Sequence, residues 1–240
     1  MHETLLSIDK LTHSFGGLKA ISNFRLHVRR GQVYGVIGPN GAGKTTLFNL
    51  ITGLYRPTEG RIVFDGHDIT GKKPHEINRL GIARTFQNLR LFSDLTVREN
   101  IVVGTLSHKR VDQQMIDELL ELVGLTQRQT EQAKNLPYGL QRKLEIARAL
   151  ATSPKLLLLD EPAAGMNPQE VLNLVELIRT IKDRFQLTVI LIEHQMRLVE
   201  AICERITVMS FGQVLAEGTV QEIQNDPTVI KAYLGEGELG

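Results

Sequence analysis

The stretch "GPNGAGKTT", residues 38–46, decides the fold of this chain. It matches the pattern G-x-x-x-x-G-K-S/T, and it lies between a short apolar run, "QVYGVIG", and a helical pattern. A chance match to this pattern in a chain of this length is about a one per cent event. We therefore predict a phosphate-binding loop here rather than a glycine-rich turn without a ligand.

The residue types in this loop suit a nucleotide and a cation. Gly41 and Gly43 allow backbone N–H groups to converge on phosphate, and the N-terminus of the following helix adds to the attraction. Lys44 is expected to hold the β- and γ-phosphates, and Thr45 to place its hydroxyl on Mg²⁺. The other nucleotide-binding residues predicted in the loop are Gly38, Pro39, Asn40, Ala42 and Thr46.

Composition sets broad limits on function. The 240 residues carry a formal net charge of +1, which argues against nucleic acid held by bulk attraction to phosphate, so we expect no nucleic-acid partner. The single cysteine, Cys203, shares an apolar stripe with Leu198, Val199 and Ile202 and is expected in the core. No basic start followed by an apolar run opens the chain, and no stretch reaches the roughly 18 apolar residues of a membrane span, so we expect a cytoplasmic protein.

The sequence predicts two kinds of β-strand: stretches of alternating apolar and polar residues in the first third of the chain, and continuous apolar runs, most of them later. Early stretches alternate apolar and polar residues between glycines, which predicts an antiparallel β subdomain. Three further runs are apolar throughout, as in buried parallel strands, and a turn and a helical pattern follow each of them, while a fourth run comes after the last helix. The alternating stretches are residues 4–15, 24–30 and 61–66, and the apolar runs are residues 32–38, 155–160, 187–193 and 205–210. The predicted fold class is α/β with a parallel core sheet.

Helical periodicity follows two of the apolar runs and fills one long segment. Leucine, isoleucine and valine recur at i, i+3, i+4 and i+7 in two sets: Leu47, Leu50, Ile51 and Leu54, then Val171, Leu174, Val175 and Ile178. Between residues 87 and 138 the pattern is helical without strands, and Gly124 is expected to end one helix. We predict a single domain over residues 1–240, with a helical subdomain at about residues 88–152 inserted into the α/β core.

Two carboxylates end the apolar run "KLLLLD" and its turn. Ligands bind at the carboxyl ends of strands in an open parallel sheet, so Asp160 is expected to face the metal. Glu161 is the candidate for orienting the attacking water, because phosphoryl transfer depends on a well-placed nucleophile. A strand-end acid can also merely solvate a turn or cap a helix.

A histidine follows another strand, in "ILIEHQM". His194 could donate a hydrogen bond to the γ-phosphate and sense its loss, although a lone histidine at a strand end is usually structural. The other histidines, His13 among them, receive no role. Gln87 stands where the sheet pattern gives way to the helical segment.

These motifs, in this order, resemble the nucleotide-binding subunits of ATP-binding-cassette (ABC) transporters. The resemblance implies the P-loop NTPase fold of an ABC cassette, ATP and Mg²⁺ as ligands, and ATPase activity. It implies that Phe15 stacks on adenine, where the alternative is a buried strand-end phenylalanine. It also implies that Gln87 reaches Mg²⁺ and water, that His194 is a switch histidine, and that Asn167 belongs to a loop at the dimer interface. Asn167 has a local explanation too, since it precedes Pro168 as a helix N-cap.

The signature segment departs from the family. There it reads L-S-G-G-Q and covers the partner subunit's ATP across a head-to-tail dimer, whereas here it reads "LPYGL", residues 136–140. Pro137 has neither a hydroxyl nor an N–H group, and Leu140 replaces the glutamine. Tyr138 and Gly139 keep their amides, so we expect retained but weakened binding across the dimer; a purely structural turn is the alternative.

The helix after this turn is expected to be amphipathic. Its predicted buried face comprises Leu140, Leu144, Ala147 and Ala151, and its predicted outward face comprises Arg142, Lys143, Glu145 and Arg148.

Within the family, "RTFQNLRLFSDLTVREN", "YGLQRKLEIARAL", "DEPAAGMNP" and "KAYLGE" are most similar to importer subunits for branched-chain amino acids. Cassettes for urea, short amides or lipopolysaccharide share much of these sequence motifs, so the identity of the transported solute stays open. The implied partners are a second copy or a similar ATPase subunit, transmembrane permease subunits and, indirectly, a solute-binding protein. The implied location is the cytoplasmic face of the inner or plasma membrane.

Two other readings remain. One is a soluble ABC ATPase that remodels ribosomes or DNA. The other is a degenerate module that binds ATP and hardly hydrolyses it. In this reading Pro137 and Leu140 weaken the composite site, which is the ATP site formed jointly by the phosphate loop of one subunit and the signature segment of the other.

Overall fold

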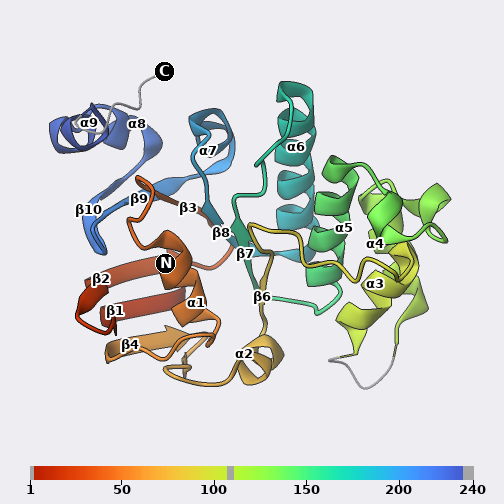
Figure 1. The fold of residues 1–240 in the computed structure, drawn as a ribbon, viewed down its shortest axis with the longest axis horizontal. Helices are drawn as coiled ribbons and strands as arrows, with labels where there is room; N and C mark the ends of the chain where they lie inside the picture. Colours follow the sequence, from red (N-terminus) through yellow and green to blue (C-terminus); the bar gives the residue numbers. More distant parts are fainter. Residues whose placement is uncertain (1–2, 107–110, 235–240) are drawn as a thin grey trace. The chain divides into compact units, whose positions relative to one another are not determined.

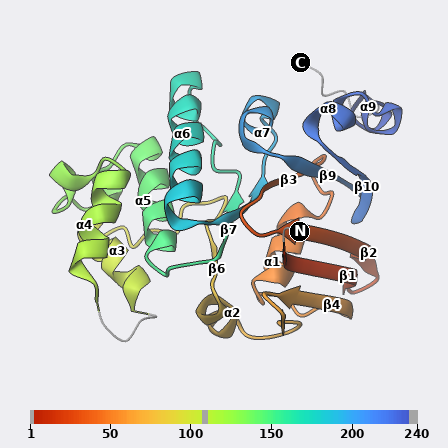
Figure 2. The same ribbon diagram turned by 180° about the vertical axis from the view of Figure 1, so that it is seen from behind.

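The computed structural model describes residues 3–106 and 111–234. Its contacts divide the chain into two units, residues 1–77 with 188–240 and residues 78–187 (Figures 1 and 2). Residues 235–240, which include the end of the motif "KAYLGE", lie outside the described residues.

The first unit begins with the predicted antiparallel sheet. Its strand order is β2 (Leu18–Arg29), β1 (Thr4–Phe15), β4 (Glu59–Phe64) and β5 (His67–Asp68). Every pairing in this sheet is antiparallel, and register shifts interrupt both long pairings of β1. Such irregularities bend a sheet and increase its twist. The alternating pattern of the sequence is confirmed in the buried faces of β1 and β2.

The same unit contains three parallel strands. β3 (Val33–Ile37) pairs with β8 (Thr188–Ile192) on one side and β9 (Arg205–Ser210) on the other, both in parallel. All residues of β3 and β8 are buried, which confirms the interpretation of the apolar runs. Gly35 is required in β3, because a Cβ there would lie 2.6 Å from Ile206 Cγ2. The unit is completed by β10 (Gln213–Gly218), α7 (Met196–Ile202), α8 (Val220–Gln224) and α9 (Pro227–Leu234).

Helix α1 (Lys44–Ile51) follows β3 and is shorter than its periodicity predicts. Leu47, Leu50 and Ile51 are buried as expected, whereas Leu54 lies outside the helix and is 46% exposed. The reason is Gly53, which has a positive φ and ends the helical path. A Cβ at Gly53 would lie 2.3 Å from the Lys72 carbonyl oxygen.

Cys203 is buried at the end of α7, as its apolar stripe predicts. Burial raises the pKa of the Cys203 thiol to about 12, with nearby carboxylates adding to the shift. The thiol therefore stays protonated at neutral pH and behaves as a small apolar side chain.

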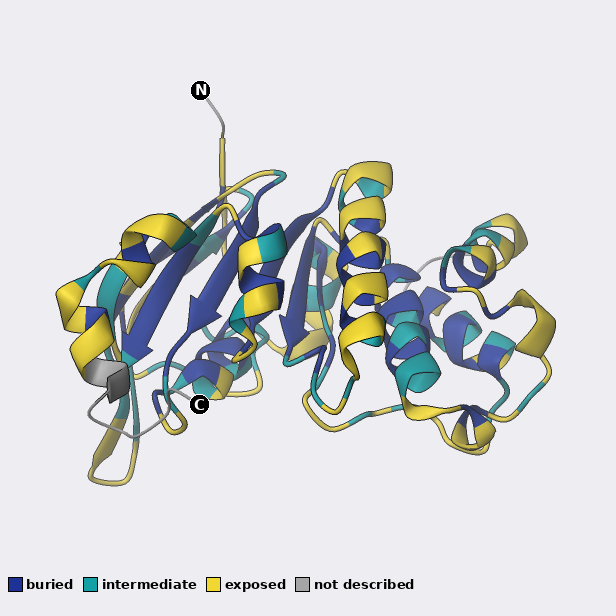
Figure 3. Cartoon of the chain, turned by 90° about the horizontal axis from the view of Figure 1, so that it is seen from above, coloured by how far each residue is buried: buried dark blue, intermediate teal, exposed yellow. Residues whose placement is uncertain are grey.

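The second unit combines two parallel strands with helices. β6 (Ile82–Arg84) pairs in parallel with β7 (Leu156–Asp160), and α2 (Pro74–Leu80) precedes β6 across the boundary of the units. Its α-helices are α3 (Val97–Thr105), α4 (Gln113–Leu122), α5 (Tyr138–Leu150) and α6 (Pro168–Phe185), and its 3₁₀ turns are Thr126–Arg128 and Ala133–Asn135. Strands β3 and β7 are buried along their whole length, whereas helix α6 is buried on one face only (Figure 3). Gly124 has a positive φ after α4, which confirms the predicted helix end.

The predicted outward face of α5 is wrong in two places. Arg142 and Glu145 are 2% and 1% exposed, and Leu140 is only partly buried. The two charged side chains face the segment before α3, and its backbone carbonyl and amide groups form hydrogen bonds with them. A helical wheel assigns charged residues to solvent and cannot anticipate such a partner.

No helix within residues 3–106 and 111–234 is long and apolar enough to cross a membrane.

Candidate functional site

The phosphate loop in the first unit depends on three glycines. Gly38, Gly41 and Gly43 all have positive φ angles, of 147°, 79° and 101°, which other residues adopt only with strain. A Cβ at Gly38 would lie 2.2 Å from the Met209 carbonyl oxygen, and one at Gly43 would lie 2.7 Å from that of Ala20. At Gly41 a Cβ would meet nothing within 4 Å, so space is open beside the loop. The loop is thus a backbone cradle that suits a phosphate chain.

Lys44 lies across this cradle. Its Nζ donates to the carbonyl oxygens of Gly38 at 2.5 Å and Pro39 at 2.9 Å, and its side chain is buried. The N-cap of α1 is Gly43, which offers no side-chain acceptor, so the first-turn amides are not capped by a side chain. Thr45 is exposed at the start of the helix. The positive charge, the amides and the hydroxyl fit a triphosphate with a bound cation.

Phe15 belongs to an aromatic cluster at the end of β1. It is 45% exposed, so the alternative of a buried phenylalanine is wrong. Its ring lies edge-on to His13, with centroids 4.7 Å apart, and edge-on to Tyr55 at 5.2 Å, while His13 and Tyr55 stack on each other. His13 Nδ1 also contacts the carbonyl oxygen of Arg56 at 3.0 Å. Sequence reasoning missed His13 and Tyr55, although positions 13 and 15 share one face of a strand.

His194 follows β8 in the first unit and is exposed. Its turn is fixed by Glu193, whose buried carboxylate accepts hydrogen bonds from the amides of His194 at 3.0 Å and Gln195 at 3.2 Å. The neighbouring acid therefore positions the backbone of His194 and leaves its ring at the surface.

Asp160 ends β7 in the second unit and is buried. Its Oδ2 accepts a hydrogen bond from Arg84 Nη2 at 2.7 Å, while its buried Oδ1 has no hydrogen-bond partner among the described residues. Burial raises the pKa of Asp160, and the Arg84 charge opposes that rise. A buried carboxylate oxygen without a hydrogen-bond partner is a suitable ligand for a hard cation such as Mg²⁺. The described residues contain no cluster of three or more His, Cys, Asp or Glu side chains arranged for a metal.

Replacing Arg84 by methionine should destabilise the fold. The substitution keeps much of the side-chain volume and leaves Asp160 buried without its ion-pair partner, which costs about 3 kcal/mol or more in the free energy of unfolding. Urea unfolding monitored by circular dichroism measures this change. Arg61→Met is the matched control, because the Arg61–Asp68 pair is exposed and contributes about 1 kcal/mol at most. Equal losses in both variants would contradict the structural role of Arg84.

Glu161 and Gln87 lie together in the second unit. Gln87 Nε2 donates to Glu161 Oε2 at 2.8 Å, although the two residues are 74 positions apart in the chain. Glu161 has a φ of 47°, a left-handed conformation that non-glycine residues adopt at a cost of about 1 to 3 kcal/mol. Two predicted site residues are thus brought into direct contact, one of them on a strained backbone.

The signature turn forms the N-terminus of α5. Pro137 is the N-cap and provides no side-chain cap, and its carbonyl oxygen accepts from the amides of Leu140 and Gln141, both at 3.0 Å. The Tyr138 ring is 44% exposed, and its hydroxyl accepts a hydrogen bond from Arg142 at 2.9 Å.

Two glycine positions shape the surroundings of this turn. A Cβ on Gly139 would lie 2.9 Å from Glu170 Oε1, and one on Gly165 would lie 3.4 Å from the Tyr138 ring. Glu170 completes a capping box with Asn167, whose side chain accepts from the Glu170 amide at 3.0 Å. The helix-capping explanation of Asn167 is therefore confirmed.

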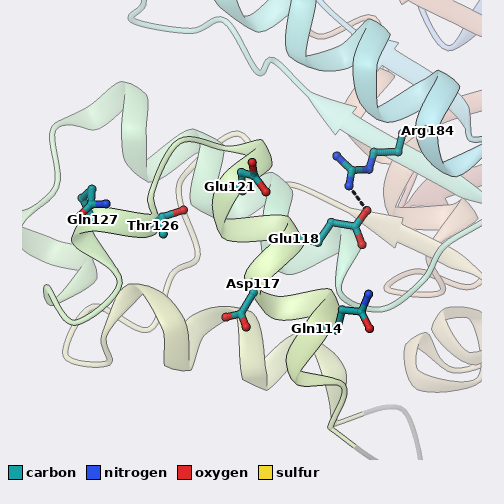
Figure 4. Close-up of a pocket in the computed structure, with 7 residues that line it drawn as sticks. All are labelled: Gln114, Asp117, Glu118, Glu121, Thr126, Gln127 and Arg184. Atoms are coloured by element: carbon teal, nitrogen blue, oxygen red, sulfur yellow. Dashed lines mark ion pairs between the residues drawn. The ribbon is translucent and has the colours of Figure 1, made fainter.

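A separate pocket of about 680 Å³ lies in the second unit (Figure 4). Glu118 on α4 forms an ion pair with Arg184 at its edge. The lining residues are Gln114, Asp117, Glu118, Glu121, Thr126, Gln127 and Arg184. None of the predicted site residues lines it, and its carboxylates would repel a phosphate chain, so it is not the nucleotide site.

Comparison with known sequences decides the family. The family profile described as ABC transporter matches residues 21–164, which include the phosphate loop, the signature turn and the Asp160–Glu161 pair. The chain belongs to the ABC transporter family. A second profile, described as branched-chain amino acid ATP-binding cassette transporter, matches residues 213–238. As a member of this family, the chain is an ATP-hydrolysing transporter subunit that binds ATP or ADP.

Curated ABC relatives are similar over nearly the whole chain. The high-affinity branched-chain amino acid transport ATP-binding protein LivG of Escherichia coli is 44% identical, with 98% of this chain and 100% of LivG covered. BraF of Pseudomonas aeruginosa, which bears the same description, gives the same identity and coverage. A probable LivG of Archaeoglobus fulgidus is 37% identical, with 96% of this chain and 95% of that protein covered.

Solved ABC cassettes have the same fold. The crystal structure of a nucleotide-free ATP-binding cassette from an ABC transporter matches with a TM-score of 0.88 and 32% identity, covering 96% of this chain and 99% of that one. The ADP conformation of an ATP-binding cassette of an ABC transporter also gives 0.88 and 32%, covering 97% and 99%. The predicted α/β ABC cassette is therefore confirmed.

Proposed function

We propose that this ABC ATPase energises the uptake of branched-chain amino acids or related solutes. The observation that carries the proposal is the 44% identity to LivG and BraF over 98% of the chain, since both relatives are described as branched-chain amino acid transport proteins. The match of residues 213–238 to the profile of branched-chain amino acid cassettes supports it independently of the catalytic motifs.

The binding roles follow from the chemistry of each residue. Residues 38–46 and the Lys44 charge bind the phosphates of ATP, and Phe15 stacks on adenine beside His13 and Tyr55. The Thr45 hydroxyl, the Gln87 side chain and the unpaired Oδ1 of Asp160 supply oxygen ligands for Mg²⁺. Mg²⁺ held by these residues would offset negative charge on the phosphates.

The catalytic roles fall to three residues. Glu161 accepts a hydrogen bond from the attacking water and orients it, and Gln87 holds the Glu161 carboxylate in place. His194 donates to the γ-phosphate and responds to its departure. The chain itself forms no covalent bond to phosphate in this mechanism, because positioning and charge suffice for phosphoryl transfer.

Two ATPase subunits close head to tail in this proposal. Residues 137–140 of one subunit then face the nucleotide held by the partner, and the loop containing Asn167 lies at the dimer interface. The helical subdomain, residues 88–152, passes the motion to transmembrane permease subunits at the cytoplasmic face of the membrane. A solute-binding protein delivers the solute to these permease subunits.

One observation favours a slow composite site instead. Pro137 lacks an N–H group, and it caps α5 without a side-chain hydrogen bond. Such a turn offers fewer donors to phosphate than a serine would, so a chain that binds ATP and hardly hydrolyses it is the second candidate.

Hydrolysis measured across protein concentrations separates these candidates. We expect Mg²⁺-dependent ATPase activity per subunit to rise with protein concentration, because each active site needs two subunits. Phosphate release at saturating ATP is the measurement, and titration of ATP binding accompanies it. A flat, negligible rate despite tight ATP binding, persisting when the permease subunits are added, would contradict the proposal and favour the slow composite site.

A further inference from the structure

A buried ion pair on α5 holds the segment around Gln87. Arg142 and Glu145 are 2% and 1% exposed, and Arg142 Nη1 lies 3.3 Å from Glu145 Oε2. Burying two charges is expensive, and apolar residues of similar volume often stabilise a fold equally well. Fold stability alone therefore does not account for this buried pair.

Arg142 binds two carbonyl groups of that segment. Its Nη1 donates to the Phe86 carbonyl oxygen at 2.6 Å, and its Nη2 donates to the Gln87 carbonyl oxygen. The same Nη2 donates to the Tyr138 hydroxyl at 2.9 Å. Arg142 thus connects the backbone of Gln87 with a side chain of the signature turn.

Glu145 binds the same segment through its amides. Its Oε1 accepts hydrogen bonds from Arg90 N at 3.2 Å and, more weakly, from Phe86 N at 3.4 Å. Burial raises the pKa of Glu145, while these amides and the Arg142 charge oppose the rise. The segment is therefore held at carbonyls and amides together, which fixes it more firmly than one contact could.

A continuous series of contacts follows from these bonds. Glu161 Oε2 accepts from Gln87 Nε2 at 2.8 Å, the Gln87 carbonyl accepts from Arg142, and Arg142 donates to Tyr138. The Tyr138 ring also lies beside Arg142, whose guanidinium carbon is 5.4 Å from the ring centroid. All of these residues belong to the second unit.

We propose that Tyr138, Arg142 and Glu145, here called the Arg142 cluster, are positioning residues that couple Gln87 and Glu161 to the signature turn. The proposal rests on the roles assigned above to Gln87 and Glu161. It gives the tyrosine at position 138 a purpose: its hydroxyl ties the turn to the loop that contacts the water-orienting carboxylate. When Gln87 moves, the turn moves with it.

A double-mutant cycle on hydrolysis tests the coupling. Tyr138→Phe removes only the hydroxyl, and we expect it to lower kcat about tenfold with little change in the KM for ATP. Because Gln87→Ala already breaks the contact between Glu161 and Gln87, adding Tyr138→Phe to it should cost less than twofold more. Losses that multiply independently in the double variant would overturn the proposal.

Arginine geometry provides a second, matched test. Arg142→Lys keeps the charge but cannot reach two carbonyls and a hydroxyl with one ammonium group, so we expect a loss of kcat of about tenfold or more. Arg179→Lys is the control, because Arg179 is exposed on α6 and paired with Glu176. It should stay within twofold of the parent. A parent-like rate for Arg142→Lys would count against the cluster.

Hydrogen exchange separates failure of this inference from failure of the proposed function. In the nucleotide-free protein, Tyr138→Phe and Arg142→Lys should each speed exchange of the amides at residues 86–90, with α6 unchanged. If the parent hydrolyses no ATP, the proposed function fails, and the exchange data still decide whether the cluster holds this segment. Unchanged exchange at residues 86–90 in both variants would overturn the inference whatever the activity.

Discussion

Glu161→Gln should lower ATP turnover about a thousandfold and leave ATP binding intact. Glu161 is the proposed water-orienting group, and its carboxylate already accepts a hydrogen bond from Gln87 at 2.8 Å. A glutamine oxygen can accept that same bond, so the local geometry should persist. What glutamine cannot do is attract the proton of the attacking water, and the loss should therefore fall on kcat alone. Single-turnover hydrolysis and ATP titration measure the two effects separately.

A trapped dimer is the second expected result for Glu161→Gln. With hydrolysis blocked, two subunits closed around ATP should stay closed, and size-exclusion chromatography with ATP should show a dimer that the parent does not retain. Glu176→Gln is the matched control, because Glu176 is exposed on α6, far along the helix from its N-cap. A parent rate in Glu161→Gln would move the water-orienting role to another residue.

The strands were predictable because their signals are local. β3, β7 and β8 are five-residue runs of buried residues, and an uninterrupted apolar run bounded by turns has few other structures open to it. The phosphate loop was predictable for a similar reason, since its three glycines have positive φ angles and, at Gly38 and Gly43, a carbonyl oxygen leaves no room for a Cβ. Sequence periodicity failed at Leu54, where one glycine ends α1 early.

The polar interior was not predictable from the sequence. Arg142 and Glu145 look like surface residues on a helical wheel, because their partners are backbone groups more than 50 residues away. The Arg84–Asp160 pair spans 76 residues and leaves no periodic signal. Likewise, nothing near Phe15 indicates that Tyr55 packs against it. Long-range partners of polar side chains depend on the tertiary fold, which local patterns do not encode.

Lys44→Ala should weaken ATP binding about a hundredfold, through a different step from Glu161→Gln. Lys44 Nζ donates to two carbonyl oxygens of the phosphate loop, so its charge is already held over the cradle before a ligand binds. A charged donor to phosphate contributes about 1.5 to 3 kcal/mol, and the loss of the cross-loop bonds adds to it. Fluorescent-nucleotide titration measures the change in Kd.

Thermal unfolding tests Lys44→Ala without any need for hydrolysis. At an ATP concentration of about a hundred times the parent Kd, bound ligand stabilises the parent by about 2.7 kcal/mol, whereas a Kd weakened about a hundredfold leaves about 0.4 kcal/mol. The ATP-induced rise in Tm should therefore nearly vanish in Lys44→Ala. Lys73→Ala removes the same charge from an exposed position and should keep the full rise. If Lys44→Ala also kept the full ATP-induced rise in Tm, the phosphates would be bound without this lysine. A general loss of charge or a loosened loop would instead lower Tm equally with and without ATP.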